Sequence, residues 1–157
     1  MKFTKRIEEM HTLIIELLQA CLDELRTQIK KFDNLQGNVD DVLDVKKALL
    51  KSFHGSFRGL LGQNYSYLGL KSRSLLRNLV EIRRLLWLLF NQDCVTFFVC
   101  LNDLRFNPLE DHHFSLFTYC DEETSKIIDR LYKLAKERIY SLSLVALQSE
   151  DRSDTLE

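Results

Sequence analysis

Residues 71–90 read KSRSLLRNLVEIRRLLWLLF, and a large aliphatic side chain recurs in them every three or four positions. This spacing matches the 3.6-residue repeat of an α-helix that buries one face. The apolar positions are Leu75, Leu76, Leu79, Ile82, Leu85, Leu86 and Leu89. Charged side chains occupy the other face, at Arg73, Arg77, Glu81 and Arg84. The pattern predicts a long amphipathic helix that packs its leucine face into a core.

Helical patterns also precede this segment. Residues 3–31 carry an apolar seam with steps of four and three, which predicts a second long helix. Its seam includes Ile7, His11, Ile14, Leu18, Cys21, Leu25 and Phe32. Breaker residues at 33–38 predict a loop, and aspartates at the start of residues 39–50 favour a short helix there. Residues 53–61 keep a helical spacing despite their glycines, so we expect a further helix.

The region after residue 90 continues in the same way. Asp93 is placed to cap a helix over residues 94–104, which Asn107-Pro108 would end. Alternating side chains from Phe114 to Thr118 suggest a short extended segment. Acidic residues from Asp121 open a last helix that we expect to end near Leu147. Residues 149–157 are acidic and polar, and we expect them to form a flexible tail.

The composition fits an all-α protein. The 157 residues include five glycines and one proline, so few helix breakers are present. We therefore expect five or six helices in one compact domain, residues 1–148, followed by the tail. The formal net charge of −1 offers no overall attraction to nucleic acid, so any DNA contact must be local. The most apolar window is residues 85–101, and Asp93 lies near its centre. An aspartate in the middle of a bilayer costs roughly 2.5–3.5 kcal/mol, so we expect no membrane span and no membrane partner.

Several motifs that could carry chemistry fail on inspection. The four cysteines have no C-x-x-C spacing and are best explained as buried free thiols in a reducing compartment. The string GLKS at 69–72 lacks the glycine that a phosphate-binding loop places before its lysine. His112-His113 with Cys120 match no structural zinc pattern. No serine or cysteine has a legible histidine partner, so the sequence predicts neither a catalytic site nor a bound cofactor.

Two rows of basic side chains remain as candidate DNA contacts. Arg73, Arg77 and Arg84 share a face of the helix at 71–90, with Lys71 near its start. Lys126, Arg130 and Lys133 share a face of the last helix. Such rows can hold successive phosphates through charge-assisted hydrogen bonds. A solvated outer face explains both rows as well, because charged outer faces are routine on helices.

The block from residue 68 to residue 104 resembles the helical region of XPF endonucleases. The family pattern there is approximately LGxKTKxLVxDLxxLRxLLxxLxxxDCVTF. This chain has LGLKSRSL at 68–75, then Leu79, Arg83 and Leu85-Leu86, and DCVTF at 93–97. ACL at 20–22 and AKERIY at 135–140 extend the resemblance over residues 12–140. The block at 68–104 is its specific part.

The resemblance implies a function without chemistry in this chain. XPF-type proteins are structure-specific nucleases of nucleotide excision repair and related DNA repair in the nucleus. Their degenerate helicase-like module carries a helical insert that serves DNA and protein contacts. Their nuclease domain binds a divalent metal through GDxxxERKxxxD, which this sequence lacks. We therefore expect a non-catalytic helical fragment of such an endonuclease, inactive alone.

The resemblance also implies partners. These are branched or forked DNA, a nuclease scaffold protein and a damage-verification protein, while the family's non-catalytic partner subunit binds elsewhere. Ile15 and Cys21 match positions linked to scaffold docking, although core packing explains Cys21 equally well. An unrelated helical adaptor that binds a partner helix and no DNA is the alternative interpretation.

Overall fold

The computed structural model describes residues 5–91, 93–106, 115–118 and 121–155, and within these ranges it contains helices and turns but no strand. The helices in chain order are α1 (Lys5–Ile29), α2 (Val39–Val42), α3 (Val45–Ala48), α4 (Phe53–Leu61), the 3-10 helix η1 (Gly62–Tyr67), α5 (Leu70–Phe90), α6 (Cys94–Phe106) and α7 (Glu122–Thr155). The all-α prediction is confirmed. The described ranges hold seven α-helices rather than five or six, because the segment expected as one short helix forms both α2 and α3.

Local capping explains this division. The Asn38 side chain accepts a hydrogen bond from the Asp40 amide at 3.0 Å and caps α2. Asp44 accepts one from the Lys47 amide at 3.3 Å and caps α3. Asn and Asp favour such N-terminal positions because their oxygens satisfy amides that lack a helical partner. A second cap within twelve residues therefore starts a new helix.

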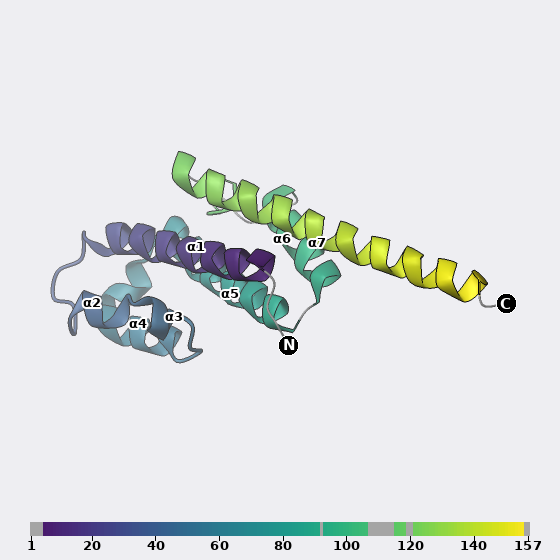
Figure 1. The fold of residues 1–157 in the computed structure, drawn as a ribbon. Coiled ribbons are helices and arrows are strands. Elements are labelled where there is room, and N and C mark those ends of the chain that lie inside the picture. Colours follow the sequence, from purple (N-terminus) through teal and green to yellow (C-terminus); the bar gives the residue numbers. More distant parts are fainter. Residues whose placement is uncertain (1–4, 92, 107–114, 119–120, 156–157) are drawn as a thin grey trace.

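The longer helices pack around α1. Helix α1 contacts α5 on one side and α7 on the other, and α6 contacts both α5 and α7 (Figure 1). The short helices α2, α3 and α4 form a separate group at one end, where α3 contacts α1. The C-terminal half of α7 extends beyond the other helices (Figure 1). The arrangement leaves one side of α5 facing α4 and solvent.

The core is continuous along α1 and α5. Every position predicted for the leucine face of α5 is buried. The buried side chains of α1 are Met10, Ile14, Leu17, Leu18, Cys21, Leu22, Leu25 and Ile29. This set is wider than the predicted seam, since α1 has a helix on each side of it. At the seam's ends, Ile7, His11 and Phe32 are only half-buried.

A polar anchor joins α5 to the turn at residues 115–118. Asn78 is buried, and its Oδ1 accepts a hydrogen bond from the Leu116 amide at 2.9 Å. Its Nδ2 donates to Glu81 Oε2 at 2.9 Å. The Thr118 amide donates to the Ser115 carbonyl at 3.1 Å, which closes a turn. The extended segment expected here is therefore wrong over residues 115–118, because these local bonds replace strand pairing.

The last two helices begin where expected. The Asp93 side chain accepts from the Thr96 amide at 3.0 Å, and Asp121 accepts from the Thr124 amide at 2.8 Å. Hydrogen bonds with the backbone and side chain of Thr124 lower the pKa of Asp121. The backbone of α7 continues to Thr155, past the end expected near Leu147 and through residues 149–155. Residues 121–157 contain neither glycine nor proline to stop it.

Some predictions concern residues outside the described ranges. These are Phe3, Pro108, His112, His113, Phe114 and Cys120. Of the other cysteines, Cys21 and Cys94 are buried and Cys100 is half-buried, each as a free thiol. Among the helices that the structure describes, none combines the length and hydrophobicity needed to cross a membrane.

Candidate nucleic-acid interface

The outward face of α5 carries a regular row of five side chains. Arg73, Arg77, Val80, Arg84 and Trp87 follow one another in steps of four, three, four and three, and all are exposed. This spacing keeps side chains in line on an α-helix. The predicted arginines therefore do share one face. Arg84 lies eleven residues after Arg73, so the row between them extends about 16 Å along the helix.

A groove runs between this row and α4. It consists of two adjoining hollows of about 620 and 410 Å³, which share His54 and Val80. Lys51, Arg84 and Trp87 line the larger hollow, together with these two residues. Tyr65, Arg73 and Arg77 line the smaller one. We call this feature the α4–α5 groove.

The wall of the groove is held by Arg83. Its Nη1 donates to the Leu50 carbonyl at 2.8 Å, and its Nη2 contacts His54 Nε2. Because arginine has no acceptor, His54 accepts through Nε2 and is neutral in this contact. Burial and then the Arg83 charge lower the pKa of His54. Burial likewise lowers the pKa of Arg83. Arg83 thus fixes α4 against α5, while the exposed arginines face outward.

The groove lies in an unusually basic part of the chain. Residues 45–92 contain nine lysines and arginines against one acidic residue, Glu81. Glu81 is half-buried, and it accepts a hydrogen bond from the buried Asn78. Among the described residues that line the groove there is no carboxylate. Within the described ranges, no carboxylate forms an ion pair with Arg73, Arg77 or Arg84. Their charges are therefore available to an anionic ligand.

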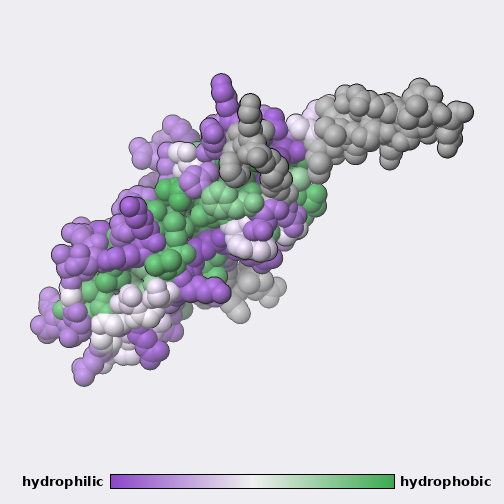
Figure 2. All heavy atoms as spheres, turned by 60° about the horizontal axis from the view of Figure 1, so that its bottom comes forward, coloured by the Kyte–Doolittle hydropathy of each residue, from purple (hydrophilic) through white to green (hydrophobic). Residues whose placement is uncertain are grey.

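Aromatic side chains accompany these charges. Trp87 is 62% exposed although it lies in a helix turn rich in buried leucines. The Arg58 guanidinium lies 5.1 Å from the centre of the Tyr65 ring. Exposed large side chains on neighbouring turns of α5 and on α6 include Val80, Phe90 and Val95. Figure 2 shows one face of the molecule, on which apolar surface forms a band between hydrophilic margins.

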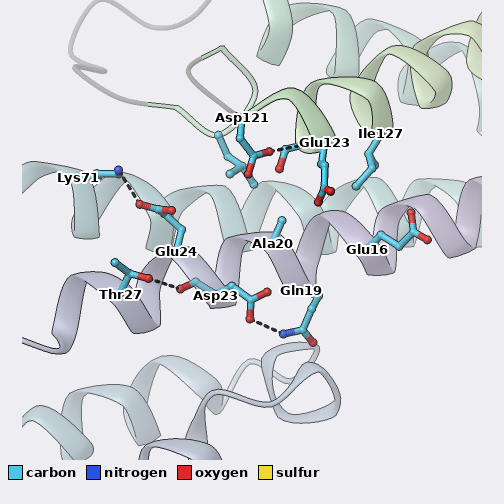
Figure 3. A pocket seen from close by; sticks show the side chains of 12 residues that line it. Glu16, Gln19, Ala20, Asp23, Glu24, Thr27, Lys71, Asp121, Glu123 and Ile127 are labelled. Carbon is cyan, nitrogen blue, oxygen red and sulfur yellow. Dashed lines mark hydrogen bonds and ion pairs between the residues drawn. The ribbon is translucent and has the colours of Figure 1, made fainter.

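Lys71 is separated from the arginine row. Its Nζ forms an ion pair with Glu24 Oε1 at 2.6 Å. It lines a different hollow, of about 660 Å³, between α1 and the start of α7 (Figure 3). The carboxylates of this hollow are Glu16, Asp23, Glu24, Asp121 and Glu123. Such an acidic surrounding repels a phosphate, so the position of Lys71 favours a structural ion pair over DNA contact.

The basic row of α7 is largely neutralised by acidic neighbours. Arg130 donates to both carboxylate oxygens of Glu9, at 2.7 and 3.1 Å. This hydrogen bond lowers the pKa of Glu9 and raises that of Arg130. Lys126 pairs with Glu122 at 3.5 Å. Lys133 is exposed. Two of these three predicted contacts therefore already serve intramolecular ion pairs, which weakens α7 as a DNA-binding surface.

The predicted docking positions lie at different depths. Cys21 is fully buried, and its thiol lies 3.4 Å from the Leu75 carbonyl. Burial raises the pKa of this thiol well above its ordinary value. Ile15 is half-buried against the core. Cys21 thus has no surface to offer a partner, and an effect of its substitution would act through the α1–α5 contact.

The structure supplies groove residues that sequence reasoning missed. His54, Tyr65 and Trp87 line the groove. Trp87 was detectable, because it continues the spacing of the arginine row, and so was the depletion of acidic residues over 45–92. His54 and Tyr65 were not, because their positions depend on how α4 packs. Among the described residues, no cluster of three histidine, cysteine or acidic side chains could hold a metal ion.

The known proteins that are similar to this chain include three DNA repair endonucleases. The DNA repair endonuclease XPF of Cricetulus griseus is 32% identical over 147 residues, covering 94% of this chain and 15% of the relative. The Mus musculus XPF is 32% identical over 144 residues, covering 92% and 14%. The DNA repair endonuclease UVH1 of Arabidopsis thaliana is 34% identical over 129 residues, covering 82% and 12%. No family model and no solved structure matches the chain.

The matches cover nearly all of the chain but only a small part of each relative. The chain spans about one-seventh of the length of the two XPF proteins. The matched segment includes the arginine row and both walls of the groove, because at most ten residues of the chain lie outside the longest match. The predicted membership of the XPF family is confirmed. Over this shared segment, the chain belongs to the XPF family of DNA-repair endonucleases.

Proposed function

We propose that this chain is a non-catalytic, DNA-contacting helical part of an XPF-type DNA-repair endonuclease that acts in the nucleus. The observation that carries the proposal is the row Arg73, Arg77 and Arg84, which is exposed and without ion pairs to carboxylates among the described residues. Family membership supplies the context of DNA repair. The chemistry of strand cleavage would belong to the nuclease domain of such proteins.

The row suits a phosphate backbone. Arginine binds phosphate through two parallel N–H donors, and these bonds are stronger than those between neutral groups. A DNA strand carries one negative charge per 3.4 Å of duplex axis, so the row's length of about 16 Å equals roughly five successive phosphates. Such contacts fix the position of DNA without reading its sequence. A domain of this kind would hold branched or forked DNA while another domain cuts it.

We also propose two protein partners for this chain. A nuclease scaffold protein could contact the half-buried Ile15 region of α1, whereas Cys21 would influence docking only through the fold. The damage-verification protein of excision repair is a further proposed partner, for which we assign no residues. The acidic hollow around Lys71 would repel DNA and is a candidate surface for such proteins.

The test is binding of this chain to a splayed-arm DNA fork, followed by fluorescence anisotropy over a range of salt concentrations. The variant replaces Arg73, Arg77 and Arg84 by glutamine. The control replaces Lys126, Lys133 and Lys136 on α7 by glutamine, so both variants lose three positive charges. All six positions are exposed, so both variants should keep the wild-type helicity, which circular dichroism checks.

Each phosphate contact contributes about 0.9 to the salt slope of duplex binding. We expect the α5 variant to lose two to three units of slope and at least tenfold in affinity, while the α7 variant changes little. Equal losses in both variants would show that total charge, not the row, attracts DNA. Absence of fork binding by the folded wild type at low salt would refute the proposal and favour the helical adaptor.

A further inference from the structure

We propose that the α4–α5 groove binds an unpaired stretch of DNA, with a base stacked on Trp87 and the adjoining phosphates on the arginine row. The inference rests on the proposed function and specifies its ligand. It depends on one feature that phosphate binding leaves unexplained. A row that only bound phosphates would need cations, and this row also contains an exposed indole.

Trp87 lies outside the hydrophobic core of the described residues. Its neighbours Leu85, Leu86, Leu88 and Leu89 are buried, whereas Trp87 is 62% exposed. A tryptophan side chain stabilises a fold by removing on the order of 200 Å² of surface from water. Trp87 gives up most of that gain and lies in a row that also holds three exposed arginines. It lies one turn after Arg84 and lines the same hollow.

An aromatic platform beside cations selects single strands. In a duplex the faces of the bases are hidden in the stack, and a protein reaches only phosphates, sugars and base edges. An unpaired base exposes its whole face, and stacking on an aromatic side chain contributes about 1–3 kcal/mol per base. Basic grooves lined with aromatic rings are the usual means of binding unpaired strands. Trp87 next to Arg84 and Lys51 has this composition.

The rest of the groove continues the same composition. Tyr65 lines the smaller hollow together with Arg73 and Arg77. Trp87 lies ten residues after Arg77 on α5, which is about 15 Å along the helix. This length accommodates roughly four nucleotides, the lower end of known single-strand sites. The Arg83–His54 contact holds the α4 wall of the groove against α5.

The chain offers a direct optical readout, because Trp87 is its only tryptophan. The probes are a twelve-residue oligothymidine and a duplex of twelve base pairs, each titrated into the full 157-residue chain. We expect oligothymidine to quench the tryptophan fluorescence as it binds, since a stacked base quenches the indole. The duplex should bind through the arginine row without comparable quenching.

Two substitutions separate stacking from folding. Trp87→Leu keeps an apolar side chain but removes the ring, and anisotropy of labelled oligothymidine should show a loss of about 5- to 100-fold in affinity. Trp87→Tyr restores a ring and should recover most of it. Neither should change binding of the duplex. Because Trp87 is exposed, both variants should unfold at the wild-type temperature.

The outcomes distinguish this inference from the proposed function. Unchanged oligothymidine affinity in Trp87→Leu, with no quenching in the wild type, would overturn the single-strand site. In that case, loss of duplex binding on neutralising the arginine row would still support phosphate contact. If the folded wild type binds neither probe at low salt, both proposals fail.

Discussion

Replacing Asn78 by alanine removes the side chain that joins α5 to the turn at residues 115–118. The Leu116 amide donates to Asn78 Oδ1 at 2.9 Å in a buried position, and Asn78 Nδ2 donates to Glu81 at 2.9 Å. In the variant, the Leu116 amide stays buried without its acceptor. We therefore expect a loss in free energy of unfolding that exceeds the value of one ordinary hydrogen bond.

The size of the loss follows from these two bonds. A buried amide without a partner costs about 1–3 kcal/mol, and the partly buried bond to Glu81 adds about 0.5–1 kcal/mol. The sum is about 2–4 kcal/mol. For a domain of this size, 1 kcal/mol shifts the melting temperature by about 2–4 °C. Asn78→Ala should therefore lower it by roughly 4–16 °C.

Urea unfolding and thermal melting followed by circular dichroism measure this loss. The matched control is Asn64→Ala. The Asn64 side chain donates a solvent-exposed hydrogen bond to the Asp33 carbonyl at 3.0 Å, and this is its only hydrogen bond to the described residues. The control should lose less than about 1 kcal/mol. Asn78→Ala should also keep wild-type DNA affinity at a temperature where it is folded, because the arginine row is on the opposite face of α5. A shift below 2 °C, or equal shifts in both variants, would refute this account of the anchor.

Three further predictions concern the core, the groove wall and α7. Leu79→Asp should abolish the cooperative melting transition, because Leu79 is fully buried and an unpaired carboxylate cannot be accommodated there; a folded, equally stable variant would refute the face assignment. Burial and the Arg83 charge lower the pKa of His54 below the value of about 6.5 expected in the unfolded chain. The neutral His54 therefore contributes to the free energy of unfolding above about pH 6.5, and this contribution is lost as the pH falls below that value. His54→Gln should therefore show a smaller drop in urea midpoint between pH 7.5 and pH 5.5 than the wild type, and equal drops would contradict this. Asp121→Ala should cost about 1 kcal/mol in urea unfolding through loss of the α7 cap, whereas Glu123→Ala, which removes an exposed carboxylate of the same helix turn that caps no amide, tests for a general effect of charge removal.

The helices were predictable because their apolar spacing is strong. Residues 71–90 need only one buried face, and each of their predicted core positions is buried. The apolar seam predicted for α1 is narrower than the face that this helix buries. Met10 and Leu17 are buried as well, because α5 and α7 cover α1 from two sides. A sequence pattern shows that a face is apolar, but the width of the buried face depends on how many neighbours pack there.

The candidate contacts divide for a similar reason. Spacing alone placed Arg73, Arg77 and Arg84 in line, and the structure agrees. It could not show that Arg130 binds Glu9, which is 121 residues away, or that Lys71 binds Glu24. Whether a surface cation is available to DNA depends on such distant carboxylates. The same limit applies to His54, whose place in the groove depends on the packing of α4.

Net charge hides the property that favours DNA binding. The whole chain has a formal charge of −1, but residues 45–92 have nine basic residues and one acidic residue, so the remaining residues carry thirteen basic and twenty-two acidic ones. Five of these nine basic residues line the α4–α5 groove, whereas five carboxylates gather at the hollow between α1 and α7, so the two signs of charge are concentrated at different sites. The positive part would approach DNA first, and the acidic hollow between α1 and α7 would be repelled. Under the proposed function, this separation of charge would orient the domain and restrict DNA to the side of α5 on which the arginine row and Trp87 lie.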